Sequence, residues 1–157
     1  MTKTRFKNKK GFSLLEVVIV VAIIAILAAI GIPRMSRGSK GANDSALSGS
    51  LAVLRNSIDL YSAEHGGSFP TESAINTQLV QYTDIDGDTD TSKDTTHIYG
   101  PYLRSIPPLP VGARKGGTTI AASDGNDIGW IYDQDDGTIK ANTTTEKDDA
   151  DVLYNTY

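Results

Sequence analysis

Residues 9–17 read Lys-Lys-Gly-Phe-Ser-Leu-Leu-Glu-Val, and they open the stretch that decides the fold. From residue 12 to residue 32, 18 of 21 residues are apolar, the exceptions being Ser13, Glu16 and Gly31. A helix of that length measures about 31 Å, which matches the ~30 Å hydrocarbon core of a bilayer. A buried helix of a small domain is rarely apolar on every face, so residues 12–32 are predicted to be transmembrane.

The flanking charges orient this segment. Five basic residues and no acidic residue precede it: Lys3, Arg5, Lys7, Lys9 and Lys10. Positive residues remain in the cytoplasm, so the chain after the span is expected to be exported. A secretory signal cut near Gly31 is the alternative, but the long apolar run and the charge at Glu16 argue against it. A carboxylate within a span costs at least ~2.5–3.5 kcal/mol, so Glu16 either has a partner or lies near the headgroups.

Composition excludes several classes of site. The chain of 157 residues has no cysteine and two histidines, which rules out disulfides, thiolate metal sites and a multi-histidine metal centre. After residue 11 there are 10 basic and 19 acidic residues, a net charge of −9, which disfavours binding to nucleic acid. No catalytic arrangement is visible, and we expect that the protein is not an enzyme.

The N-terminal stretch resembles the type IV prepilin processing site. A basic leader ends in Gly11, Phe12 follows, and Glu16 is the fifth residue after the junction. Pro33 stands where many pilin-like helices carry a proline. The resemblance implies that residues 1–11 are a cytoplasmic leader, that prepilin peptidase cuts after Gly11, and that the new Phe12 amine is methylated. Residues 12–32 would then be retained, and in a fibre the Glu16 carboxylate would pair with a neighbouring copy's amine.

A helical pattern continues beyond the apolar run. Apolar residues recur at spacings of four, three, four and three: Leu47, Leu51, Leu54, Ile58 and Tyr61. This stripe predicts a helix to about residue 65, ended by Gly66-Gly67. Pro33, with the glycines around it, should weaken or kink the middle of one long helix. The alternative is a linker there and a second helix from about residue 43.

The remainder predicts a small antiparallel sheet. We expect a short helix over 72–80, a loop over 84–94 and irregular chain over 100–112. Strands are expected at 118–122, 128–133 and 137–141, and the last two should form a hairpin. Trp130 and Tyr132 should pack against the helix stripe. The polar chain after Asn142 has few residues to order it.

The second half of the chain is similar to the major pseudopilin of type II secretion, pseudopilin G. The similarity lies in residues 54–71, in Gly100-Pro101-Tyr102-Leu103-Arg104 and in Ile106-Pro107. It implies the α+β pilin fold, with a long N-terminal helix on a small antiparallel sheet. Residues 33–157 would then form a periplasmic domain that includes the distal half of the helix.

Two acidic loops are candidate calcium sites. Asp84, Asp86, Asp88 and Asp90 alternate around Gly87, and their oxygens suit Ca²⁺, which takes six to eight oxygen ligands. Asp124 and Asp127 form a second candidate, because pseudopilin G carries calcium in its C-terminal loop region. The alternative for both is a solvated acidic loop.

Together these observations predict a structural subunit of a periplasmic pseudopilus that assists protein export. Its expected partners are further copies in a helical homopolymer, prepilin peptidase, the inner-membrane assembly platform and minor pseudopilins. It would begin as a single-pass inner-membrane protein with a cytoplasmic N-terminus. One alternative is a type IV pilin for adhesion, motility or DNA uptake. Another is a membrane-anchored periplasmic calcium-binding domain that does not polymerise.

Overall fold

A long helix followed by small sheets gives the α+β fold that the sequence predicts. The computed structural model describes residues 11–148 and 150–157, with side chains described outside residues 30–40. Helix α1 spans Leu14–Glu64, so residues 33–47 continue a helix and do not form a linker. The chain divides into two compact units at residues 38 and 39. Pro33 belongs to the first unit, and the kink expected there stays a prediction.

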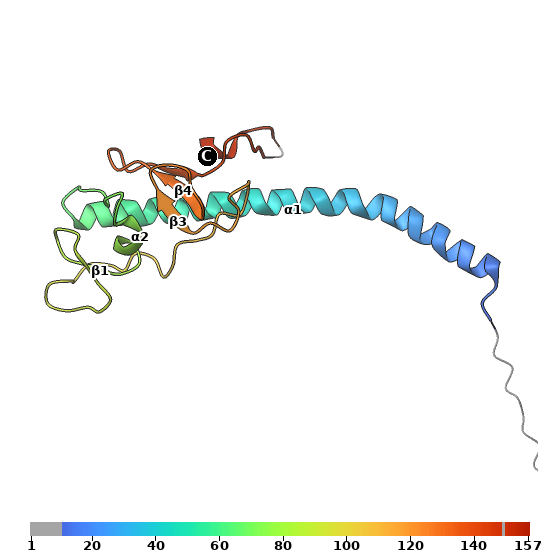
Figure 1. Cartoon of the computed structure of the whole chain (residues 1–157), viewed down its shortest axis with the longest axis horizontal. Coiled ribbons are helices and arrows are strands. Elements are labelled where there is room, and N and C mark those ends of the chain that lie inside the picture. Colours follow the sequence, from blue (N-terminus) through green and yellow to red (C-terminus); the bar gives the residue numbers. More distant parts are fainter. Residues whose placement is uncertain (1–10, 149) are drawn as a thin grey trace, which may run out of the picture. The chain divides into compact units, whose positions relative to one another are not determined.

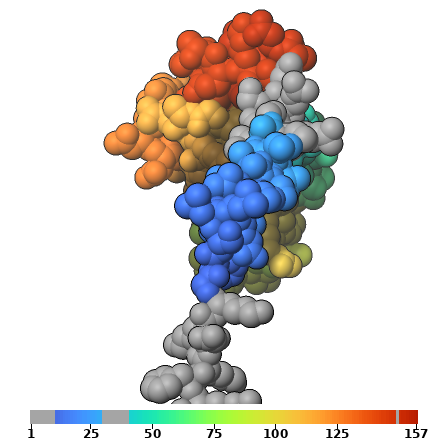
Figure 2. All heavy atoms as spheres, turned by 90° about the vertical axis from the view of Figure 1, so that its right-hand side faces the viewer, coloured from blue at the N-terminus to red at the C-terminus, as the bar shows by residue number. Residues whose placement is uncertain are grey.

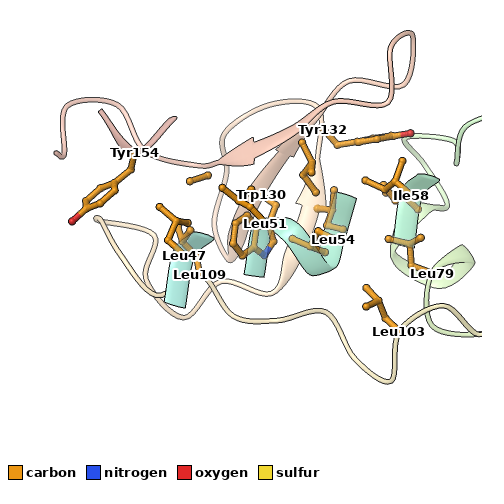
Figure 3. Close-up of a cluster of buried hydrophobic side chains, with 14 of the residues drawn as sticks. Leu47, Leu51, Leu54, Ile58, Leu79, Leu103, Leu109, Trp130, Tyr132 and Tyr154 are labelled. Carbon is orange, nitrogen blue, oxygen red and sulfur yellow. The ribbon is translucent and has the colours of Figure 1, made fainter. Parts of the chain in front are cut away.

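The predicted stripe of α1 forms the centre of the core in the second unit. All five of its residues are at most 3% exposed: Leu47, Leu51, Leu54, Ile58 and Tyr61. Trp130 and Tyr132 pack onto this stripe from the sheet, as expected (Figure 3). Irregular chain closes the core, because Leu103, Leu109 and Val111 are buried although no strand contains them.

The sheet over α1 is mixed, which corrects the predicted antiparallel sheet. Its strands are β3 (Thr119–Ala121), β4 (Ile128–Tyr132) and β5 (Ile139–Ala141), in the order β3-β4-β5. Strands β4 and β5 form the expected antiparallel hairpin, but β3 pairs with β4 in parallel. Because β3 has only three residues, the short connection 122–127 is long enough to return the chain beside it. Figure 1 shows β3 and β4 beside the C-terminal part of α1.

The acidic loop and the C-terminal segment are more ordered than predicted. Strands β1 (Tyr82–Thr83) and β2 (Thr89–Asp90) form a small antiparallel hairpin, whose turn and second strand lie inside the expected loop 84–94. The predicted helix over 72–80 is shorter, as α2 spans Ile75–Gln78. A 3₁₀ helix, η1, spans Tyr154–Thr156 in the segment expected to be loose.

Two side chains attach this C-terminal segment to α1. The Tyr154 ring is 6% exposed, and its hydroxyl donates a hydrogen bond to the Asp44 carboxylate at 2.7 Å. Arg55 Nη2 donates to the backbone oxygen of Tyr157 at 2.6 Å. The ordering therefore comes from buried aromatic surface together with polar contacts to the helix.

Candidate assembly segment and acidic loops

The segment that the sequence marks for processing is exposed. Gly11, Phe12 and Ser13 precede α1 in non-helical conformation, and Phe12 is 85% exposed. A Cβ atom added at Gly11 would meet no atom within 4 Å. The peptide bond after Gly11 is therefore sterically accessible in the described chain. The rest of the predicted leader, residues 1–10, lies outside the described residues.

Glu16 belongs to the first turn of α1, where it has a local structural role. Its carboxylate oxygen Oε2 accepts a hydrogen bond from the Ser13 N–H at 3.3 Å. The Ser13 carbonyl in turn accepts the first helical bonds, from the N–H groups of Glu16 at 3.1 Å and Val17 at 3.3 Å. The pattern Ser-x-x-Glu is half of a capping box, in which a glutamate three residues after the cap reaches back to the cap's N–H. Sequence reasoning missed this role, although the Ser-x-x-Glu spacing signals it.

A run of apolar side chains surrounds the helix on every side. Twelve large hydrophobic residues here are each at least 50% exposed: Phe12, Leu14, Leu15, Val17, Val18, Ile19, Val20, Val21, Ile23, Ile24, Ile26 and Leu27. Figure 2 shows the spheres of this segment in blue, open to the viewer. Exposed apolar surface of this extent marks an interaction site for membrane or protein. Within the described residues, no helix combines the length and the hydropathy that a membrane crossing requires.

The first acidic loop uses a carboxylate to shape its own turn. Asp84 Oδ1 accepts hydrogen bonds from the N–H groups of Asp86 at 3.0 Å and Asp88 at 2.9 Å. Gly87 has a φ of 88°, and a Cβ there would lie 2.5 Å from the Tyr61 hydroxyl. Asp90 accepts the N–H of Ser92 at 2.7 Å. The carboxylates of Asp84 and Asp90 thus accept hydrogen bonds from backbone N–H groups of the same loop, and this turn needs no cation to form.

The two aspartates of the second acidic loop, Asp124 and Asp127, contact different partners. Asp124 forms a bidentate ion pair with Arg114, through Nε at 2.8 Å and Nη2 at 2.9 Å. Asn142 Nδ2 donates to the same carboxylate at 2.9 Å. The Arg114 and Asn142 donors lower the pKa of Asp124 to about 2. Asp127, in contrast, occupies a left-handed turn with φ 59°, and its carbonyl accepts the N–H of Thr119 at 3.2 Å.

In the part of the chain that the structure describes, the predicted calcium ligands of each loop do not gather around one point. Among the described residues, no three carboxylate or histidine side chains are grouped so that they could share a metal ion. Calcium binding at these loops stays a prediction of the sequence. The described carboxylates of Asp84 and Asp124 are, however, directed at N–H donors.

Residues near the end of α1 form an aromatic cluster. The rings of Tyr61 and His65 stack at 3.8 Å between centroids, and Tyr102 meets Tyr61 edge-on at 5.5 Å. His65 is 5% exposed, and its two ring nitrogens lie 2.8 Å from the carbonyl oxygens of Tyr61 and Asp84. Tyr102 donates to the Glu64 carboxylate at 2.7 Å. The buried histidine therefore joins α1 to the β1–β2 hairpin.

The comparisons with known proteins identify the first part of the chain. A sequence model described as the prokaryotic N-terminal methylation motif matches residues 6–32. No curated protein and no solved structure matches the chain. The matched segment contains the predicted processing junction, Glu16 and the exposed apolar residues. It supports a type IV pilin-like structural subunit that is processed by prepilin peptidase, and it is consistent with membrane anchoring before fibre assembly.

Proposed function

We propose that this protein is the repeating subunit of a periplasmic pseudopilus that assists protein export across the outer membrane. The observation that carries the proposal is the exposed apolar segment directly after a methylation-type junction. Before assembly, residues 12–32 lie in the inner membrane with the leader in the cytoplasm. After cleavage the same apolar side chains pack against those of other copies, which replaces lipid by protein as their apolar surroundings.

The pairing of charges gives this packing its register. Cleavage after Gly11 creates an amine at Phe12, and an unpaired amine inside an apolar core is costly. Glu16 is the only acidic residue between Phe12 and Ile32, so it is the partner that this segment offers. An intermolecular pair between Glu16 and a neighbour's amine therefore favours one axial position of adjacent subunits. Breaking such a buried pair costs about 3–5 kcal/mol per contact.

The experiment must separate this pairing from the local helix cap. Glu16→Gln keeps an oxygen that accepts the Ser13 N–H but removes the charge. Glu16→Ala removes both the charge and the acceptor. Ser13→Ala is the matched control, because it changes the capping residue but keeps both the Glu16 carboxylate and the Ser13 N–H that donates to it. Each variant is overproduced together with the assembly machinery, and the sheared fibres are quantified by immunoblotting and electron microscopy.

We expect both Glu16 variants to be processed and inserted normally and to give no fibres, while Ser13→Ala gives fibres. Fibres from Glu16→Gln at the yield of the unmodified protein would show that the charge has no role in assembly. Fibres from Glu16→Gln but not from Glu16→Ala would assign Glu16 to helix capping and contradict the pairing.

A role in secretion is favoured over a surface pilus by the segments similar to pseudopilin G. Residues 54–71 and 99–108 meet in the aromatic cluster of Tyr61, His65 and Tyr102. The net charge of −9 beyond the leader also disfavours DNA uptake. Deletion of the gene should block release of exported proteins and leave twitching motility intact. The reverse result would assign the chain to a type IV pilus.

A further inference from the structure

The loops at the C-terminal side of the sheet converge on one arginine. Arg114 lies in the loop before β3, Asp124 in the connection from β3 to β4, and Asn142 directly after β5. The Arg114 guanidinium and the Asn142 amide hold the Asp124 carboxylate from two sides. Glu146, farther along, accepts the N–H of Ala113 at 2.7 Å and so joins the C-terminal segment to the same loop.

The oxygens of this cluster are already engaged by nitrogen donors. Both oxygens of Asp124 accept hydrogen bonds from Arg114. Glu146 Oε1 accepts from Ala113, and its Oε2 accepts from Thr144 and Thr145 at 3.0 and 3.1 Å. These side chains line a cavity of about 130 Å³ together with Thr143, whose buried hydroxyl has no hydrogen-bond partner among the described residues. That hydroxyl supplies one neutral oxygen, whereas Ca²⁺ requires six to eight oxygen ligands.

The orientation of the Asn142 amide is a second observation against a metal ion at Asp124. Its Nδ2 lies 2.9 Å from Asp124 Oδ1 and 2.7 Å from the carbonyl oxygen of Ile128. Both neighbours only accept hydrogen bonds, so the amide must present its NH₂ group to them. A metal ion at Asp124 would need the amide oxygen there instead. The positive charge that faces Asp124 is thus the guanidinium of Arg114.

We propose that the Arg114 guanidinium takes the place of a metal ion in this region, so that the loops around Asp124 are joined without calcium. A planar guanidinium fits a carboxylate through two parallel hydrogen bonds, whereas calcium would draw several oxygens toward one point. The C-terminal segment then depends on the Arg114 loop through Ala113 and Glu146. Changing calcium concentration should leave this region unaffected, and removing Arg114 should loosen it.

The calcium arm of the test uses the full chain in detergent. The starting protein carries Asp86→Ala and Asp88→Ala, which removes acidic side chains of the β1–β2 hairpin as a source of calcium binding. Its melting temperature is measured in EDTA and in about 5 mM Ca²⁺, above the ~10⁻³ M weak end of extracellular calcium modules. The same pair of measurements is made after adding Asp124→Asn. We expect Asp124→Asn to leave the difference in melting temperature between EDTA and Ca²⁺ unchanged, whether or not that difference is zero. A calcium-dependent rise that Asp124→Asn removes would overturn the proposal.

The arginine arm uses neighbouring substitutions in the otherwise unchanged chain. Arg114→Met should lower the melting temperature by a few degrees, because the pair is partly exposed and screened by solvent. Lys115→Met removes the same charge one residue later and should leave it unchanged, since Lys115 forms none of the ion pairs among the described residues. The melting temperature of Arg114→Lys should lie between those of Arg114→Met and Lys115→Met, because an ammonium keeps the charge but cannot make the bidentate contact. Equal melting temperatures for Arg114→Met and Lys115→Met would refute the role of Arg114.

Discussion

Two leucines of α1 allow the packing of the domain to be tested with a matched pair. Leu54 is fully buried beneath the sheet, whereas Leu60, six residues later on the same helix, is 51% exposed. Replacing Leu54 by alanine removes the same atoms as replacing Leu60, but only the first change leaves a cavity in the core. A buried Leu→Ala substitution costs about 3–5 kcal/mol, through lost burial and the cavity left behind.

The loss of stability expected for Leu60→Ala is much smaller. Full burial of a leucine side chain contributes about 1.5–3 kcal/mol, and Leu60 keeps roughly half of its surface in solvent, so its truncation should cost about 1 kcal/mol or less. Domains of this size have a total stability of about 5–15 kcal/mol. Leu54→Ala should therefore remove a large share of the stability, with a fall in melting temperature of about 10 °C or more.

Intrinsic fluorescence provides the assay, because Trp130 is the only tryptophan and is fully buried beside the stripe. Urea unfolding of the full chain should show a strongly lowered midpoint for Leu54→Ala and a nearly unchanged midpoint for Leu60→Ala, with similar slopes. Equal midpoints for the two variants would refute the assignment of the Leu47–Tyr61 stripe to the core.

Two further changes probe the sheet and the C-terminal loops. Gly137 has a φ of 70°, and a Cβ there would overlap the Phe69 ring, so Gly137→Ala should lower the free energy of unfolding by about 2 kcal/mol or more in urea titrations. Arg114 and Asn142 lower the pKa of Asp124, and backbone N–H groups led by that of Ala113 lower the pKa of Glu146, in each case to about 2. Because a lowered carboxyl pKa stabilises the fold above the unfolded value near 4, unfolding measured against pH should show this contribution intact above about pH 4 and lost toward pH 2. A domain that keeps the same melting temperature down to pH 2 would contradict those contacts.

The elements that the sequence predicts best are those whose pattern is local. The spacing of Leu47, Leu51, Leu54 and Ile58 fixes the buried face of α1, because a 3.6-residue period admits one packed side. The hairpin of β4 and β5 is likewise predictable from two short runs joined across Gly137. The cap formed by Ser13 and Glu16 was also readable, because its spacing is a known signature.

Features that depend on distant contacts were not predictable. The parallel pairing of β3 with β4 depends on the short return at 122–127 and on Asp127 adopting a left-handed conformation. The C-terminal segment contains few apolar residues, but Tyr154 reaches Asp44 across 110 positions of sequence. In the same way, the aspartates of both acidic loops suggest calcium by composition. Only the fold shows that Asp124 faces Arg114 and that Asp84 faces its own backbone.

The N-terminus of the mature protein tests the central claim most directly. The protein is extracted from membranes of cells that contain prepilin peptidase, and its N-terminal peptide is sequenced by mass spectrometry. We predict a chain that begins at N-methylated Phe12, with residues 1–11 removed and the apolar segment retained. Replacing Gly11 by a bulky residue should leave the precursor uncut. A protein that begins at Met1, or one that begins after Gly31, would contradict the account of a pilin-like subunit.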